Sequence, residues 1–157
     1  MRILRLGLLA AMALFCASGQ TQANGPVDAT PRAAFDQFIA AFNNLDWEAF
    51  RRCFADSASL FNPDIPDAIS LHRMDGREEI ERNFRAVFAA VAAGTGDKRS
   101  PNIHPENVRL QQFGDTGVIT FEFKRAEHST GRRTIVFERL KGFWLIVHIH
   151  ASNVKSR

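Results

Sequence analysis

Near its C-terminal end the sequence reads Gly142-Phe143-Trp144-Leu145-Ile146-Val147-His148-Ile149-His150-Ala151-Ser152. Its β-branched and aromatic content, together with alternating apolar and polar positions, predicts a β-strand over residues 143–154. A period of two places His148 and His150 on one face of this strand. The opposite face then carries the apolar set Leu145, Val147, Ile149 and Ala151. We expect that apolar face to pack on the core.

The same period extends backwards from this strand. It predicts three earlier strands over residues 108–113, 118–125 and 133–140. The segments between the strands are short and contain glycine, at residues 114–117, 129–131 and 141–142. Short glycine-containing connections join antiparallel neighbours, so the second half of the chain is predicted to be an antiparallel meander.

The first half of the chain carries helix signals instead. Thr30-Pro31 offers a capping hydroxyl and a proline at the first helical position, and Asp46 offers a cap for a second, short helix. Asp75-Gly76-Arg77-Glu78 is read as a capping box that opens a third helix ending at Gly94. Residues 58–61 and 69–73 are read as strands. The sequence therefore predicts an α+β fold with three N-terminal helices and about five to six strands.

This order and this last strand resemble the SnoaL-like branch of the nuclear-transport-factor-2-like superfamily, over residues 31–154. The ending is similar to the G-x-W-x-I-V-H-x-H-x-S strand of many SnoaL-like proteins and of the calcium/calmodulin-dependent protein kinase II association domain. Asp75-Gly76 and Phe61-Asn62-Pro63 also fit. The resemblance implies a cone-shaped fold, in which three helices pack in a curved mixed or antiparallel sheet around an apolar pocket.

Two departures limit what this resemblance implies about function. The kinase association domain carries an arginine directly after the second histidine, whereas this chain has Ala151, so an anionic-ligand role is not carried over from that relative. The ketosteroid-isomerase relatives use a tyrosine hydroxyl in their oxyanion hole, and this chain contains no tyrosine. That kind of site is excluded in its usual form.

The N-terminus is typical of a signal peptide. Two arginines precede an apolar run over residues 6–17, and Thr21-Gln22-Ala23 is a plausible cleavage site. We expect residues 1–23 to be removed, residues 24–29 to form a short tail and residues 30–157 to form one secreted or periplasmic domain. Loss of Arg2 and Arg5 lowers the formal net charge from +3 to +1, which argues against a nucleic-acid partner. No membrane contact is expected after cleavage.

The chain contains 14 phenylalanines, which predict a large apolar interior. The leading hypothesis is a pocket that binds a small, largely apolar molecule. Its expected lining is Phe38, Phe42, Phe61, Phe84, Phe88, Phe121, Phe137 and Ile149. One alternative is an isomerase, cyclase or hydrolase that uses a pocket Asp or His as acid–base. Another is a homodimeric assembly module whose pocket is filled by its own side chains.

The candidate catalytic residues are Asp56, His148 and His150. Asp56 would need burial beside Phe54 and Phe61 to act as a base. The histidines are expected on the outside of the sheet, against a second subunit, unless a bulge turns one toward the pocket. An H-x-H strand pair can also ligate a metal, but no third ligand is indicated, so neither a metal nor any other cofactor is expected.

Glu122 lies mid-strand between two phenylalanines. We expect its carboxylate to pair with an arginine of the neighbouring strand, Arg133 or Arg139. A pocket carboxylate is the second interpretation.

Overall fold

The computed structural model describes residues 30–62, 73–93, 102–125 and 129–155. The expected signal peptide over residues 1–23, the tail over residues 24–29 and Gly94 lie outside the described residues. So does most of the expected strand over residues 69–73.

Three helices form, at Pro31–Asn43 (α1), Trp47–Arg52 (α2) and Arg77–Ala92 (α3). The first two begin as the sequence predicts. The Thr30 hydroxyl accepts the Ala33 N–H at 3.2 Å, and the Asp46 carboxylate accepts the Ala49 N–H at 2.9 Å. None of the three described helices has the length and hydrophobicity of a membrane span.

The predicted capping box at α3 is wrong by one position. Gly76 is the N-cap, at φ +87°, and it provides no side-chain cap. The reciprocal half of the motif comes from Glu79, whose carboxylate accepts the Asp75 N–H at 3.0 Å. The Asp75 carboxylate instead pairs with Arg73 at 2.7 Å. A positive φ is inexpensive only for glycine, which explains why the helix begins after Gly76.

Six strands form one sheet in the order β2-β1-β6-β5-β4-β3. Their bounds are Phe54–Phe61 (β1), Met74–Asp75 (β2), Glu106–Phe113 (β3), Thr116–Lys124 (β4), Ser129–Leu140 (β5) and Phe143–Lys155 (β6). Every pair is antiparallel except β1 with β6, which is parallel. The predicted α+β class, with three helices and a curved mixed sheet, is confirmed, and β1 begins four residues before the expected 58–61.

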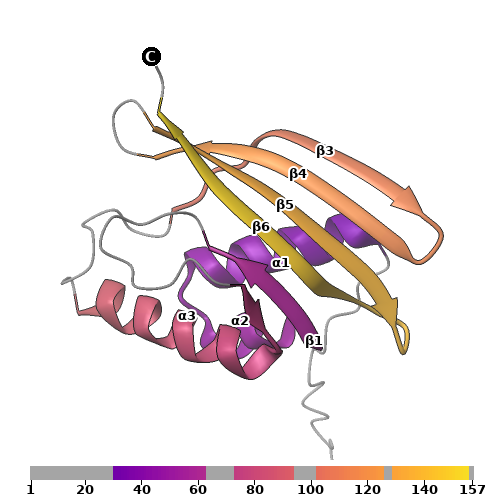
Figure 1. The fold of residues 1–157 in the computed structure, drawn as a ribbon, viewed down its shortest axis with the longest axis horizontal. Coiled ribbons are helices and arrows are strands. Elements are labelled where there is room, and N and C mark those ends of the chain that lie inside the picture. Colours follow the sequence, from indigo (N-terminus) through magenta and orange to yellow (C-terminus); the bar gives the residue numbers. More distant parts are fainter. Residues whose placement is uncertain (1–29, 63–72, 94–101, 126–128, 156–157) are drawn as a thin grey trace, which may run out of the picture.

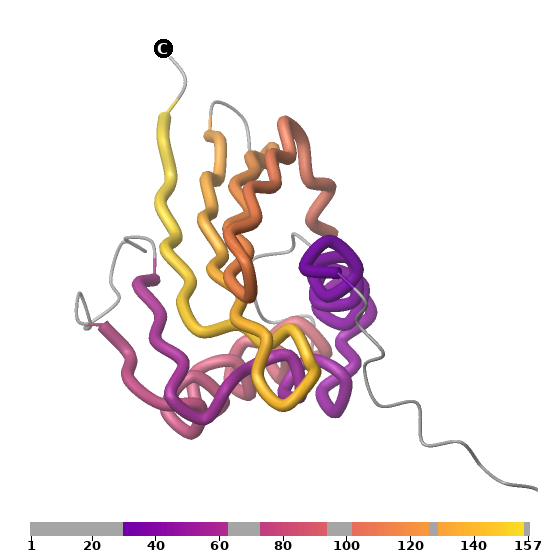
Figure 2. The backbone as a smooth tube through the Cα atoms, turned by 90° about the vertical axis from the view of Figure 1, so that its right-hand side faces the viewer, coloured from indigo at the N-terminus to yellow at the C-terminus, as the bar shows by residue number. Residues whose placement is uncertain are grey.

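All three helices lie on one side of the sheet (Figures 1 and 2). We call that side the inner face. In register across it lie Ile119 of β4, Ile135 of β5 and Ile149 of β6, each at most 4% exposed. Figure 2 shows α1 end-on beside β3, at the far edge of the sheet from β1. No described helix packs on the opposite, outer face.

A β-bulge in β6 leaves Ile149 and Ala151 inward as predicted but makes the prediction wrong for Leu145 and Val147. The register shifts between Phe137↔Ile146 and Val136↔His148, so Val147 has no direct partner. The buried residues of the strand are therefore Trp144, Ile146, Ile149 and Ala151. Leu145 lies instead opposite the exposed Glu138, on the outer face.

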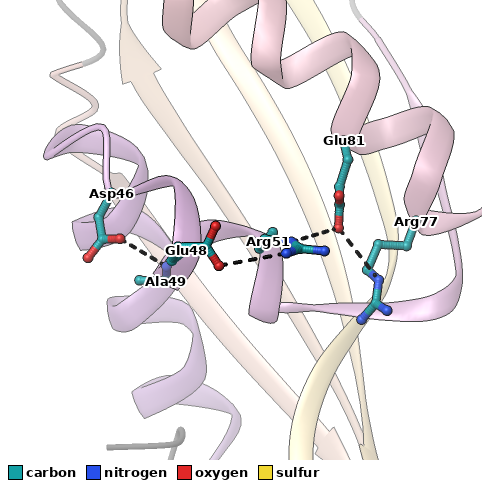
Figure 3. Close-up of polar contacts among 6 residues, drawn as sticks. All are labelled: Asp46, Glu48, Ala49, Arg51, Arg77 and Glu81. Carbon is teal, nitrogen blue, oxygen red and sulfur yellow. Dashed lines mark hydrogen bonds and ion pairs between the residues drawn. The ribbon is translucent and has the colours of Figure 1, made fainter. Parts of the chain in front are cut away.

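An ion-pair network joins α2 to α3 (Figure 3). The Glu81 carboxylate lies 3.2 Å from Arg51 Nε and 3.6 Å from Arg77 Nε, and its side chain is only 15% exposed. Hydrogen bonding to Glu81 raises the pKa of Arg51. Arg51 also contacts Glu48 at 3.7 Å, within its own helix. Because α2 has only six residues, this cross-helix anchor helps to hold it in place.

Replacing Glu81 with glutamine is expected to lower the melting temperature by about 2–4 °C. The amide keeps the shape of the side chain but leaves two guanidinium groups without their shared carboxylate. Thermal unfolding followed by circular dichroism measures this effect. Glu78→Gln, on an exposed position of the same helix, is the matched control. An equal shift in both variants would contradict the role assigned to Glu81.

Candidate functional site

Four of the expected pocket residues pack together in the helical layer. The rings of Phe38, Phe42, Phe84 and Phe88 each contact Phe50, at centroid distances of 5.5, 5.9, 4.9 and 5.1 Å. Phe50 itself is 0% exposed. These phenylalanines fill the space between the helices with one another, as edge-to-face and tilted pairs do in protein cores.

Three other expected pocket residues lie on the inner face of the sheet. Phe121, Phe137 and Ile149 are 3%, 1% and 4% exposed. The Phe121 ring meets Phe35 of α1 edge-on at 5.1 Å. Through this contact α1 packs against β4.

Phe61 lies away from these residues. It pairs with His150 across the β1–β6 ladder and is 38% exposed. Its ring lies 5.8 Å from both histidine rings. Paired residues share a face, so Phe61 belongs to the outer face and does not line the inner side of the sheet.

Both histidines lie on the outer face, as the sequence predicts in its first interpretation. The bulge is present, but it changes the facing only of the residues before it, of which Trp144 and Ile146 become the inward ones, and it leaves His148 and His150 outside. His148 Nδ1 lies 2.9 Å from the Ser59 hydroxyl. Burial lowers the pKa of His148, and the neighbouring His150 and Arg73 lower it further. This histidine is therefore neutral at physiological pH.

The lowered pKa of His148 predicts a loss of stability in acid. The unfolded chain takes up a proton near the ordinary histidine pKa of about 6.5, whereas the folded state resists it until a lower pH. The unfolded state thus binds more protons, so the free energy of unfolding falls as the pH drops through this window. His148→Gln should flatten that part of the profile in urea denaturation. His104→Gln, at an exposed position, should leave the pH profile of stability unchanged. Equal profiles for the wild type and both variants would contradict the prediction.

Asp56 has the surroundings of a surface residue. Its side chain is 86% exposed, and its carboxylate lies 2.7 Å from Arg77 Nη2. The burial that a general base would need at this position is missing. Asp56 instead ties the beginning of β1 to the first turn of α3.

A hollow of about 330 Å³ lies over the outer face where β3–β6 meet. Most of its lining comes from outer-face residues, namely His150, Thr120, Thr134, Ser152, Asn107 and the ion pair of Glu122 and Arg132, and Phe121 and Arg133 also border it. Glu122 bonds Asn107 at 3.0 Å and Arg132 at 3.1 Å, and these contacts lower its pKa. The predicted partner, Arg133 or Arg139, is thus wrong, because Arg132 is the residue directly opposite Glu122.

Arg133 faces the other way, a placement that sequence reasoning missed. It pairs with Phe121 and Ala151 on the inner face. Its guanidinium carbon lies 4.8 Å above the Phe123 ring. The sequence contained a signal for this placement, because a strand period of two puts Arg133 on the same face as the apolar Ile135 and Phe137. We call the group Phe121, Phe123, Arg133 and Asn153, where β4 and β6 end, the inner rim.

Asn153 is the second polar member of the inner rim. Its position opposite Gly131 places it on the inner face, beside the Phe123 ring that lies over that glycine. Its side-chain oxygen is buried and has no hydrogen-bond partner in the described parts of the chain. The indole N–H groups of Trp47 and Trp144 share that condition. Buried polar atoms are rarely left unpaired, so the inner rim offers a hydrogen-bond acceptor, the Asn153 side-chain oxygen, that a bound molecule could use.

No group of three or more metal-ligating side chains comes together in the described parts of the chain.

Comparison with known proteins bears on the whole domain. A family model for the SnoaL-like domain matches residues 32–155. A solved structure from Thiobacillus denitrificans, a proposed calcium/calmodulin-dependent protein kinase type II association domain, is similar with a TM-score of 0.64 and 23% identity, covering 83% of this chain and 100% of that one. No curated protein matches the chain significantly.

Two further similar structures carry names of enzymes. A proposed NTF2-like dehydratase from Streptomyces avermitilis has a TM-score of 0.58 and 20% identity, covering 78% of this chain and 92% of that one. A proposed ketosteroid isomerase from Shewanella frigidimarina has a TM-score of 0.58 and 18% identity, covering 81% and 98%. At these identities the likeness establishes the NTF2-like fold alone.

Proposed function

The chain belongs to the SnoaL-like domain family, and on that premise we propose that it binds a small, largely apolar molecule at the inner rim. The observation that carries this proposal is the buried side-chain oxygen of Asn153, which has no hydrogen-bond partner among the described residues and lies beside the apolar ring of Phe123. An apolar wall with a few unsatisfied polar groups is the usual composition of a small-molecule site.

Binding is favoured over acid–base catalysis by the residues of the inner face. On this face β4, β5 and β6 carry no Asp, Glu or His among the described residues, because Glu122, Glu138, His148 and His150 all lie on the outer face. A general acid or base must come within hydrogen-bond reach of its substrate. The likeness to structures named as a dehydratase and an isomerase is therefore a weaker argument for catalysis than the composition of the inner face is for binding.

Fluorescence titration with N-phenyl-1-naphthylamine, a neutral apolar probe, tests this proposal. We expect saturable binding to the purified protein, weakened several-fold by Phe123→Leu. Phe61→Leu makes the same change on the outer face, at a residue that is 38% exposed and lies away from the inner rim, and should leave the titration unchanged. Absence of saturable binding would refute the proposal, as would equal weakening by both variants.

We also propose that two copies associate through the outer face. Near the hairpin ends this face carries Phe113 and Phe143, which are 66% and 43% exposed, beside the half-buried Val118, Val136 and Leu145. Exposed apolar surface of this kind marks association sites. Sedimentation of the wild type across a concentration series should give a dimer, and Val136→Lys should give a monomer. A wild type that stays monomeric throughout would rule out this association.

Secretion remains a proposal that rests on residues 1–23. Expression of the full chain in a bacterial host, followed by mass spectrometry of the periplasmic fraction, should give a protein that begins at Asn24. Recovery of the uncleaved chain from the cytoplasm alone would contradict it.

A further inference from the structure

We propose that the molecule bound at the inner rim carries an anionic group, a carboxylate on an aromatic or alkyl body, and that the Arg133 guanidinium binds it. This inference rests on the binding proposed above and names the chemical class of the ligand. It follows from the hydrogen bonds, the charge and the apolar contacts of Arg133.

The hydrogen bonds of Arg133 leave one edge of its guanidinium group open. Nη1 donates to two backbone carbonyls, those of Arg132 at 2.7 Å and Ser152 at 2.8 Å. These bonds hold the group in place from one side. Nε and Nη2 have no acceptor among the described residues. The Nε–Nη2 edge presents two parallel N–H groups, which is the geometry that binds a carboxylate with two hydrogen bonds.

The charge of Arg133 is also uncompensated. No carboxylate of the described residues lies within ion-pair distance of it, since Glu122 is held by Arg132 and Asn107 on the outer face. Burial and, to a smaller extent, the nearby Arg125 cation together lower the pKa of Arg133 to about 10. The side chain still carries its charge at neutral pH. A cation partly removed from water without a counter-ion is unfavourable, and an anionic ligand group would relieve that penalty.

The surroundings of the guanidinium determine the rest of the ligand. One face of the group stacks on Phe123, and the neighbours across the ladder are Phe121 and the small Ala151. An ion such as phosphate would gain nothing from these rings. A molecule with an apolar body gains both the ion pair and the burial of its hydrocarbon surface. The inner rim therefore fits an amphiphilic carboxylate better than either a neutral apolar molecule or a free inorganic anion.

A matched pair of competitors tests this inference. 2-Naphthoate and 2-naphthamide share one ring system and differ in the charge of one substituent. Each is titrated against N-phenyl-1-naphthylamine bound to the full protein. We expect naphthoate to displace the probe at roughly one-tenth of the naphthamide concentration, because its hydrogen bonds to the guanidinium are charge-assisted and therefore stronger. Arg133→Met should abolish that preference, whereas Arg132→Met, one residue away on the outer face, should preserve it.

The outcomes separate the two proposals. If the probe does not bind at all, the proposed apolar site fails. If the probe binds but both competitors displace it equally, or if Arg132→Met removes the preference as Arg133→Met does, the apolar site stands and the carboxylate inference is overturned. Should Arg133→Met not fold, Arg133→Lys gives a second test. It keeps the charge but loses the paired N–H edge, so the preference should fall several-fold, and an undiminished preference would overturn the assignment.

Discussion

Replacement of Phe50 by alanine is expected to lower the free energy of unfolding by about 3–5 kcal/mol. Phe50 is 0% exposed and its ring lies at the centre of the helical layer. It contacts Phe38, Phe42, Phe84 and Phe88, and additionally Phe54 at 5.2 Å and Trp47 at 6.1 Å. Removing this ring leaves a cavity that its neighbours, anchored on three different helices and β1, cannot collapse into.

Urea denaturation at a fixed protein concentration measures this loss. A total stability of about 5–15 kcal/mol is usual for a domain, so the change would remove a large part of it. Val87→Ala is the control, because this side chain of α3 is 37% exposed and should change stability by no more than about 0.5 kcal/mol. A loss below about 1 kcal/mol for Phe50→Ala would contradict the central place given to its ring.

Addition of a single methyl group at Gly117 is expected to destabilise the fold by about 1–3 kcal/mol. A Cβ atom at this position would lie 2.6 Å from Cβ and 3.0 Å from Cγ of Pro31. Pro31 is fully buried and begins α1, so it is a rigid neighbour that can yield only if the helix moves. Gly117 thus sets how closely α1 approaches β4.

Thermal and urea unfolding of Gly117→Ala measure that effect. Thr116→Ala changes the preceding residue of the same strand, whose side chain faces the opposite way, and should alter stability by no more than about 0.5 kcal/mol. Because Gly117 does not have a positive φ, backbone strain does not contribute to the expected loss. A Gly117→Ala protein as stable as the wild type would show that α1 can shift freely on the sheet.

Local signals in the sequence predicted the elements but not all of their ends. The caps at Thr30 and Asp46 were found because a capping side chain acts within three residues of the chain. The start of α3 was missed by one position because Gly76 takes a backbone conformation that no side-chain pattern reveals. The first half of β1 was missed because Phe54–Ser57 reads as the continuation of the preceding helix.

The candidate site shows the same division. Except for Phe61, the phenylalanines expected in the interior lie there, but which of them pack together and which face the inner rim depends on contacts between distant elements. A base role for Asp56 required burial beside Phe54 and Phe61, yet its side chain is 86% exposed and pairs with Arg77, 21 positions later. Glu122 was expected to pair with Arg133 or Arg139, and a register difference of one residue gave it Arg132 instead. That same register turns Arg133 inward.

The sequence by itself determined the α+β class, the order of the elements and the outward placement of His148 and His150, because hydrophobic period and capping chemistry act over a few residues. Only the tertiary structure decided the inner rim. The bulge at Val147 and the pairing of β4, β5 and β6 select which face each side chain takes, and a shift of one residue exchanges the faces. Strand pairing is set by the burial of the whole sheet, so the uncompensated guanidinium of Arg133 emerges only when all three strands are in place.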